Sequence, residues 1–155
     1  MKSLRLAMAA AVLLIAGCHP SGQTPQAANN KPSVDHGWVR LSAVPGQPSA
    51  AYFTLHGGDT LIALDSVSAP GVGSAMIHAT QSKGAMSEMT MLDKIDLPAH
   101  GLVTLAPGGM HVMLMDVTPA LTSGTTLRMT LHFHGGEVLT TDAKVIAAGD
   151  PEPKF

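Results

Sequence analysis

The chain has 155 residues, about one domain's worth of sequence. Nine lysines and arginines against eleven acidic residues give a formal net charge of −2, so no basic surface is predicted and nucleic-acid binding is disfavoured. The single cysteine excludes an internal disulfide, a CxxC redox pair and a thiolate zinc site, whereas methionine and histidine are abundant, at ten and eight residues.

The N-terminal segment is predicted to be a lipoprotein leader. A positively charged start is followed by an apolar stretch, Ala7–Ile15, that is too short to span a membrane as a mature helix. The stretch ends in Ile15-Ala16-Gly17-Cys18, which resembles the bacterial lipobox. The resemblance implies that residues 1–17 are removed and that Cys18 is acylated, so that Cys18 is an anchor rather than a ligand or nucleophile.

The remaining chain is expected to work outside the cytoplasm, in the periplasm or cell envelope. His19 stands where Asp would favour retention at the inner membrane, so the outer membrane is favoured. Residues 18–33 are polar and read as the lipidated cysteine and a flexible tether. A single domain is predicted over residues 34–148, followed by a short tail at 149–155, and we expect a monomer.

Short alternating segments separated by Gly, Pro and Asp predict an all-β domain, an antiparallel sandwich. A turn is expected at Pro107-Gly108-Gly109, a tight hairpin at His134–Glu137, and a short helical turn near Pro119–Leu121. The expected strands are Trp38–Ser42, Ala51–His56, Thr60–Val67, Ala75–Ala79, Ala85–Met91, Gly101–Leu105, His111–Asp116, Thr125–His134 and Glu137–Ile146.

Side-chain alternation assigns faces in two of these strands. The strand 125–134 places one apolar set on the core face and a polar set toward solvent: Leu127, Met129, Leu131 and Phe133 against Arg128, Thr130, His132 and His134. In the strand that begins at His111, Val112 and Leu114 form the natural core face. His111, Met113 and Met115 therefore point elsewhere, which is unusual for a purely structural strand.

Seven of the ten methionines lie between Met76 and Met115. Core packing is the expected role of Met76, Met86, Met91 and Met129, because Met fills gaps in apolar interiors. Met89 and Met113 lie beside histidine-bearing, polar sequence and are better ligand candidates. Thioethers bind zinc, calcium or magnesium poorly but bind Cu(I) well, and imidazole suits copper in either oxidation state.

The spacing His78, ten residues, Met89, twenty-one residues, His111, one residue, Met113 resembles that of the PCuAC-type periplasmic copper chaperones. The surrounding sequence agrees, in Pro107–Met115 around the second pair and in Trp38-Val39-Arg40 upstream. The similarity extends from about Asp35 to Val145. Met110, after the double glycine, departs from many relatives, and the C-terminal tail lacks the Met and His residues that some members carry.

The resemblance implies a cupredoxin-like β-sandwich with Greek-key connections that binds one Cu(I) through His78, Met89, His111 and Met113. It also implies a carrier rather than an enzyme, which delivers copper toward the CuA centre of cytochrome c oxidase, often alongside a Sco-type protein. Two residues apart on a strand, His111 and Met113 share a face. His78 and Met89 flank a turn at Gly84 and could close over the same ion.

Four other functions compete with this one. A copper-sequestering or tolerance lipoprotein would need the same site, so the sequence does not separate it from a delivery protein. An electron-transfer cupredoxin needs a cysteine thiolate, and the only cysteine, Cys18, is assigned to the lipid anchor. A structural lipoprotein would use the methionines for packing alone. Enzymes find little support, because HExxH, GxSxG and phosphate-loop motifs are absent.

The remaining histidines are expected to be structural. His19 lies in the tether, and His36, His56 and His100 are isolated in sequence and read as surface or loop residues. His132 and His134 share a strand face, which is expected to be an ordinary solvated face rather than a weak divalent metal site.

Overall fold

The computed structural model describes residues 30–83 and 86–155, so the leader, Cys18, most of the tether and the turn at Gly84 lie outside the described residues. Within the described ranges the regular structure is entirely β, and none of it is a helix long and apolar enough to cross a membrane. The strands are β1 (Ser33–Arg40), β2 (Ser49–His56), β3 (Ile62–Ser68), β4 (Ser74–Lys83), β5 (Met86–Met91), β6 (Ile95–Leu97), β7 (Leu102–Thr104), β8 (Met110–Met115), β9 (Thr126–Phe133) and β10 (Val138–Ile146).

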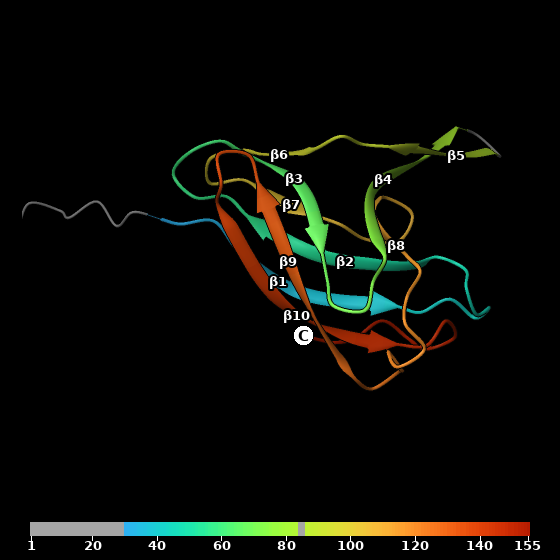
Figure 1. Ribbon diagram of the computed structural model, residues 1–155. Helices are drawn as coiled ribbons and strands as arrows, with labels where there is room; N and C mark the ends of the chain where they lie inside the picture. Colours follow the sequence, from blue (N-terminus) through green and yellow to red (C-terminus); the bar gives the residue numbers. More distant parts are fainter. Residues whose placement is uncertain (1–29, 84–85) are drawn as a thin grey trace, which may run out of the picture.

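These described strands form one sheet in the order β5-β4-β8-β2-β1-β10-β9-β3-β6, with β7 pairing the end of β2 (Figure 1). Neighbouring strands are antiparallel except β1 and β10, which run parallel. Strands from both halves of this order contribute to a single buried cluster, so the sheet curls around one core. The all-β fold expected from the sequence is confirmed.

The face assignments made from alternation are confirmed in both strands. Leu127, Met129, Leu131 and Phe133 of β9 are all buried. In β8, Val112 and Leu114 are fully buried in the core. The residues that alternate with them along β8 lie on the opposite, outer face of the sheet. The outer face of β8 is therefore the face that carries His111 and Met113.

The two turns expected from glycine also form. Gly135 and Gly136, with φ of 89° and 92°, connect β9 to β10, and Phe133 and Glu137 close the hairpin by a backbone hydrogen bond of 2.9 Å. The segment near Pro119–Leu121 forms a turn rather than a helix, and the Leu121 amide donates to the Thr118 carbonyl at 3.0 Å.

Among the described residues, the contacts of the domain begin earlier in the chain than the sequence predicts. Asn30, in the predicted tether, exchanges hydrogen bonds with Asp59, amide to carboxylate at 3.0 Å and carbonyl to the Asp59 amide at 2.9 Å. β1 begins at Ser33 rather than Trp38, and a bulge between Asp35 and Trp38 interrupts its pairing with β2. This bulge disrupts the alternation by which a strand is recognised in a sequence. The three-residue strand β6 was not predicted at all.

The core assignment is wrong for Met86 and Met91, and Met76 is half-buried on the outer face, where it pairs with Met113. Met129 is fully buried as expected, but Met86 and Met91 are 77% and 60% exposed. Both belong to β5, which lies at the edge of the sheet, and every residue of that strand is exposed. A side chain on a projecting edge strand has no second layer to pack against, so apolar character alone does not bury it.

This division of the methionines predicts different costs for removing them. Met129→Ala should lower the free energy of unfolding by about 2–5 kcal/mol, because it leaves a cavity in a closely packed interior. Met86→Ala should change it by less than about 0.5 kcal/mol, because the side chain is mostly hydrated already. Urea unfolding of the two variants measures the difference, and equal losses would contradict the assignment.

Candidate metal site

The two candidate histidines lie directly across from each other on adjacent strands. β4 and β8 are antiparallel in a register that pairs His78 with His111 and Met76 with Met113. Directly paired residues project from the same face of a sheet. The imidazole centroids of His78 and His111 are 5.9 Å apart, with the ring planes at 64°. The register therefore places both rings together on the outer face.

Both candidate thioethers lie on the same outer face. Met113 is two residues beyond His111 on β8, and Met89 on β5 pairs with Thr80 of β4, two residues beyond His78. An open hollow of ≈ 280 Å³ is lined in part by Met89, His111 and Met113. All four residues predicted from the sequence thus come from three adjacent strands, β5, β4 and β8, and three of them line one hollow.

A backbone carbonyl orients the ring of His111. His111 is only 7% exposed, and its Nδ1 lies 3.1 Å from the Gly109 carbonyl oxygen. Because a carbonyl can only accept, Nδ1 must carry and donate the proton, which leaves the Nε2 lone pair free. Histidine ligands of metals are commonly held in this way, by a hydrogen bond from the nitrogen that does not bind the metal.

The loop before β8 brings that carbonyl into position. The Ala106 amide donates to the Met110 carbonyl at 2.9 Å, and the Gly109 amide donates to the Ala106 carbonyl at 3.0 Å. Gly108 has a φ of 79°, a backbone conformation that residues other than glycine rarely adopt. The expected turn at Pro107–Gly109 is thus present, and it holds the Gly109 carbonyl within hydrogen-bond distance of the His111 ring.

His78 has an unsatisfied ring nitrogen. Its Nδ1 is buried and has no hydrogen-bond partner among the described residues. Buried polar atoms are nearly always paired, because removing them from water without a partner costs free energy. Coordination of a metal would satisfy this nitrogen, so the residues present fit a metal ion.

An aromatic pair, which sequence reasoning missed, adjoins His111. Tyr52 of β2 is 8% exposed and lies 6.4 Å from the His111 ring, and Trp38 of β1 lies 4.3 Å from Tyr52, centroid to centroid. Arg40 lies over the Trp38 ring at 5.2 Å. Tyr52 lines the hollow on its β2 side, and Trp38 packs against Tyr52. Only the register across β8, β2 and β1 reveals their closeness to His111, which no spacing in the sequence encodes.

The donor set favours a soft metal. Within residues 30–83 and 86–155, no group of three or more His, Cys, Asp or Glu side chains could hold a metal ion. A site that joins His78 to His111 has two imidazoles, and the nearby thioethers of Met89 and Met113 are the donors available to complete its coordination. Zinc, calcium and magnesium prefer thiolate, imidazole or oxygen ligands, whereas thioethers suit Cu(I).

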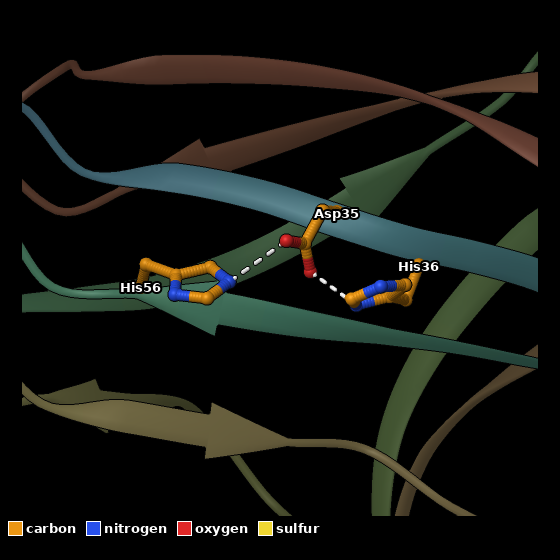
Figure 2. Close-up of polar contacts among 3 residues, drawn as sticks. All are labelled: Asp35, His36 and His56. Atoms are coloured by element: carbon orange, nitrogen blue, oxygen red, sulfur yellow. Dashed lines mark hydrogen bonds and ion pairs between the residues drawn. The ribbon is translucent and has the colours of Figure 1, made fainter. Parts of the chain in front are cut away.

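Two other histidines share one carboxylate, away from the hollow. Figure 2 shows His36 of β1 and His56 of β2 approaching Asp35 from opposite sides, with nitrogen–oxygen distances of 2.7 Å and 3.0 Å. His36 has a φ of 52°, within the bulge of β1, and its ring also contacts Phe155 with centroids 4.9 Å apart. They are half-exposed strand residues, as a surface assignment requires, but they are not isolated.

The remaining described histidines are on the surface and have separate partners. His132 contacts the Ser68 hydroxyl at 3.1 Å, His134 lies 3.4 Å from Asp65, and His100 lies 3.8 Å from Asp59. His132 and His134 therefore do not converge on one point, which agrees with the solvated face expected from the sequence.

The environment of Tyr52 predicts a measurable pH dependence. Burial raises the pKa of the Tyr52 phenol above its ordinary value, the Arg40 cation opposes this rise, and the Glu152 carboxylate adds to it. The pKa of Tyr52 is therefore higher in the folded chain than in the unfolded chain. The contribution of the protonated phenol to the free energy of unfolding is complete at pH values below the unfolded pKa, and it is lost as the pH rises through the folded pKa.

Tyr52 is the only tyrosine, so the ultraviolet absorbance of its phenolate reports this group alone. In the metal-free chain the titration midpoint should lie above that of the unfolded chain, and Arg40→Gln should raise it further. A midpoint at or below the unfolded value would contradict the buried position of the phenol.

Comparisons with known proteins agree with this architecture. The family model described as "Putative lipoprotein LpqE-like" matches residues 33–145. The chain is 30% identical over 139 residues to "Putative lipoprotein Lxx21020" of Leifsonia xyli subsp. xyli, an alignment that covers 86% of this chain and 83% of the relative.

Two similar solved structures are of copper-bound proteins. The copper-bound PCuAC domain from PmoF2 is 30% identical with a TM-score of 0.62, covering 77% of this chain and 96% of that domain. The CuI form of DR1885 from Deinococcus radiodurans is 31% identical with a TM-score of 0.59, covering 79% and 81%. The resemblance to PCuAC-type proteins seen in the sequence is confirmed, and the chain belongs to the LpqE-like family, with the fold of PCuAC domains.

Proposed function

We propose that this protein is an extracytoplasmic Cu(I) metallochaperone that binds one ion per chain through His78, Met89, His111 and Met113. The observation that carries the proposal is the pairing of His78 with His111 on one outer face, with both thioethers on the same face. The orientation of His111 by the Gly109 carbonyl and the unpartnered Nδ1 of His78 support it. The choice of metal is supported by two similar solved structures, the copper-bound PCuAC domain from PmoF2 and the CuI form of DR1885.

Two imidazoles and two thioethers match the preferences of the cuprous ion. Cu(I) is soft and binds thioether sulfur readily, without the thiolate that an oxidising compartment would convert to a disulfide. A blue-copper electron-transfer site would require a cysteine ligand, and Cys18 is the only cysteine in the sequence. The proposed role is therefore storage and transfer of the ion rather than electron transfer.

The proposed location is the cell envelope. Lipoprotein relatives agree with the lipobox at Ile15–Cys18, so we infer that Cys18 is acylated and that the following segment connects the domain to a membrane. The domain would then present its copper site to partners within the same compartment.

Cu(I) titration of the full chain, in competition with a chromogenic chelator, tests the site. One equivalent should bind, and Met113→Leu or His111→Ala should weaken binding by more than about tenfold, since even outer-shell changes at metal sites cost that much. Met115→Leu is the matched control, because Met115 lies on the same face of β8 without lining the hollow. Equal affinity of all four proteins would refute the site.

Delivery requires that another protein can reach the ion. The hollow is open, and Met89, on the edge strand, is 52% exposed, so incoming ligands can displace the thioethers stepwise. We propose that the acceptor is a Sco-type protein or the cytochrome c oxidase subunit that carries CuA.

Deletion of the gene under copper limitation distinguishes delivery from sequestration. Cytochrome c oxidase activity should fall, and should return with the wild-type gene but not with Met113→Leu, whose site loses a sulfur ligand. Unchanged oxidase activity together with greater copper sensitivity would instead assign the protein to copper tolerance.

A further inference from the structure

A methionine outside the proposed ligand set lies directly across from His78. In the register of β4 and β5, Met91 pairs with His78, whereas Met89 pairs with Thr80. Directly paired side chains on antiparallel strands have Cβ atoms about 4.5–5.5 Å apart on the same face. The Leu92 amide donates to the Ile77 carbonyl at 2.8 Å, which extends the pairing past Met91. Met91 is thus a close neighbour of His78 on the outer face.

His78 therefore lies between two sets of donors. His111 flanks it on β8, beside the hollow, and Met91 flanks it on β5. Figure 1 shows β5 at the edge of the sheet, next to β4. Met91 is 60% exposed and is not part of the lining of the hollow. Its sulfur has no role in the core, and β5 has a free edge along which another protein can approach.

We propose that His78 and Met91 form a second, transient Cu(I) position, here called the handover position, from which the ion leaves for an acceptor. This inference rests on the proposed function and names the exit from the same site. The unpartnered Nδ1 of His78 gives both positions a shared nitrogen donor. The ion would move along the outer face from the hollow to the exposed edge of the sheet.

The step is a ligand exchange without a redox change. A lone pair of the Met91 sulfur forms a bond to Cu(I) while the bonds from Met89, His111 and Met113 to the ion break. The copper stays cuprous, and no proton moves. A ligand atom of the acceptor protein then replaces Met91 on the ion, and a second ligand atom replaces His78. Met91 would stabilise an intermediate of transfer rather than the resting complex.

Stopped-flow transfer of Cu(I) from the loaded full chain to a synthetic peptide with two cysteine thiolates tests the proposal. Met91→Leu keeps the apolar shape but removes the sulfur. It should leave equilibrium Cu(I) affinity within about threefold yet slow transfer by about tenfold, as expected when an interaction made only along the transfer path is lost. Met86→Leu is the matched control, on the same exposed strand but the opposite face, and should change neither quantity.

Several outcomes separate this inference from the proposed function. Failure of the wild-type chain to bind Cu(I) would refute the proposed function itself. Normal binding with an unchanged transfer rate in Met91→Leu would overturn the handover position alone. Slowing of the same size in Met86→Leu would also overturn it, because any change on the edge strand would then slow transfer. An affinity loss in Met91→Leu as large as in Met89→Leu would overturn it too, because Met91 would then be a ligand of the resting complex.

Discussion

The antiparallel pairing of β4 with β8 is the constraint on which the rest of the site depends. It places His78 beside His111, with ring centroids 5.9 Å apart, and directs both rings away from a core that contains Ile77 and Val112. The alternation that buries one face of these strands necessarily exposes the other. The core packing that stabilises the fold therefore also fixes the positions of the two candidate histidine ligands, without any separate structural element.

The side chains on the outer face differ in exposure from one side of the site to the other. On the β1–β2 side, the Tyr52 ring lies beside His111 and Trp38 packs against Tyr52, while the Gly109 carbonyl orients the His111 ring. On the β5 side, Met89 and Met91 are more than half exposed. A carrier needs both properties, because preorganised donors hold the ion and exposed, exchangeable sulfurs let an acceptor remove it. The site combines them across adjacent strands of one sheet.

Much of this arrangement could be predicted from the sequence, because alternation records burial where a strand has one buried face. Leu127–Phe133 and the division of β8 into Val112 and Leu114 against His111 and Met113 were recognisable for that reason. Met86 and Met91 were misassigned because both faces of the edge strand β5 are exposed. The predicted first strand was too short because the bulge in β1 interrupts the alternation of its residues. The register that joins Tyr52 and Met91 to the histidines depends on distant strands, which a local pattern does not contain.

The central claim is that thioether sulfur binds the ion beside imidazole nitrogen, and X-ray absorption at the copper edge measures this most directly. The full chain loaded with one equivalent of Cu(I) should show both sulfur and nitrogen scatterers in the first coordination shell, with the sulfur contribution reduced in Met113→Leu. A shell of nitrogen and oxygen alone, unchanged in that variant, would contradict the account.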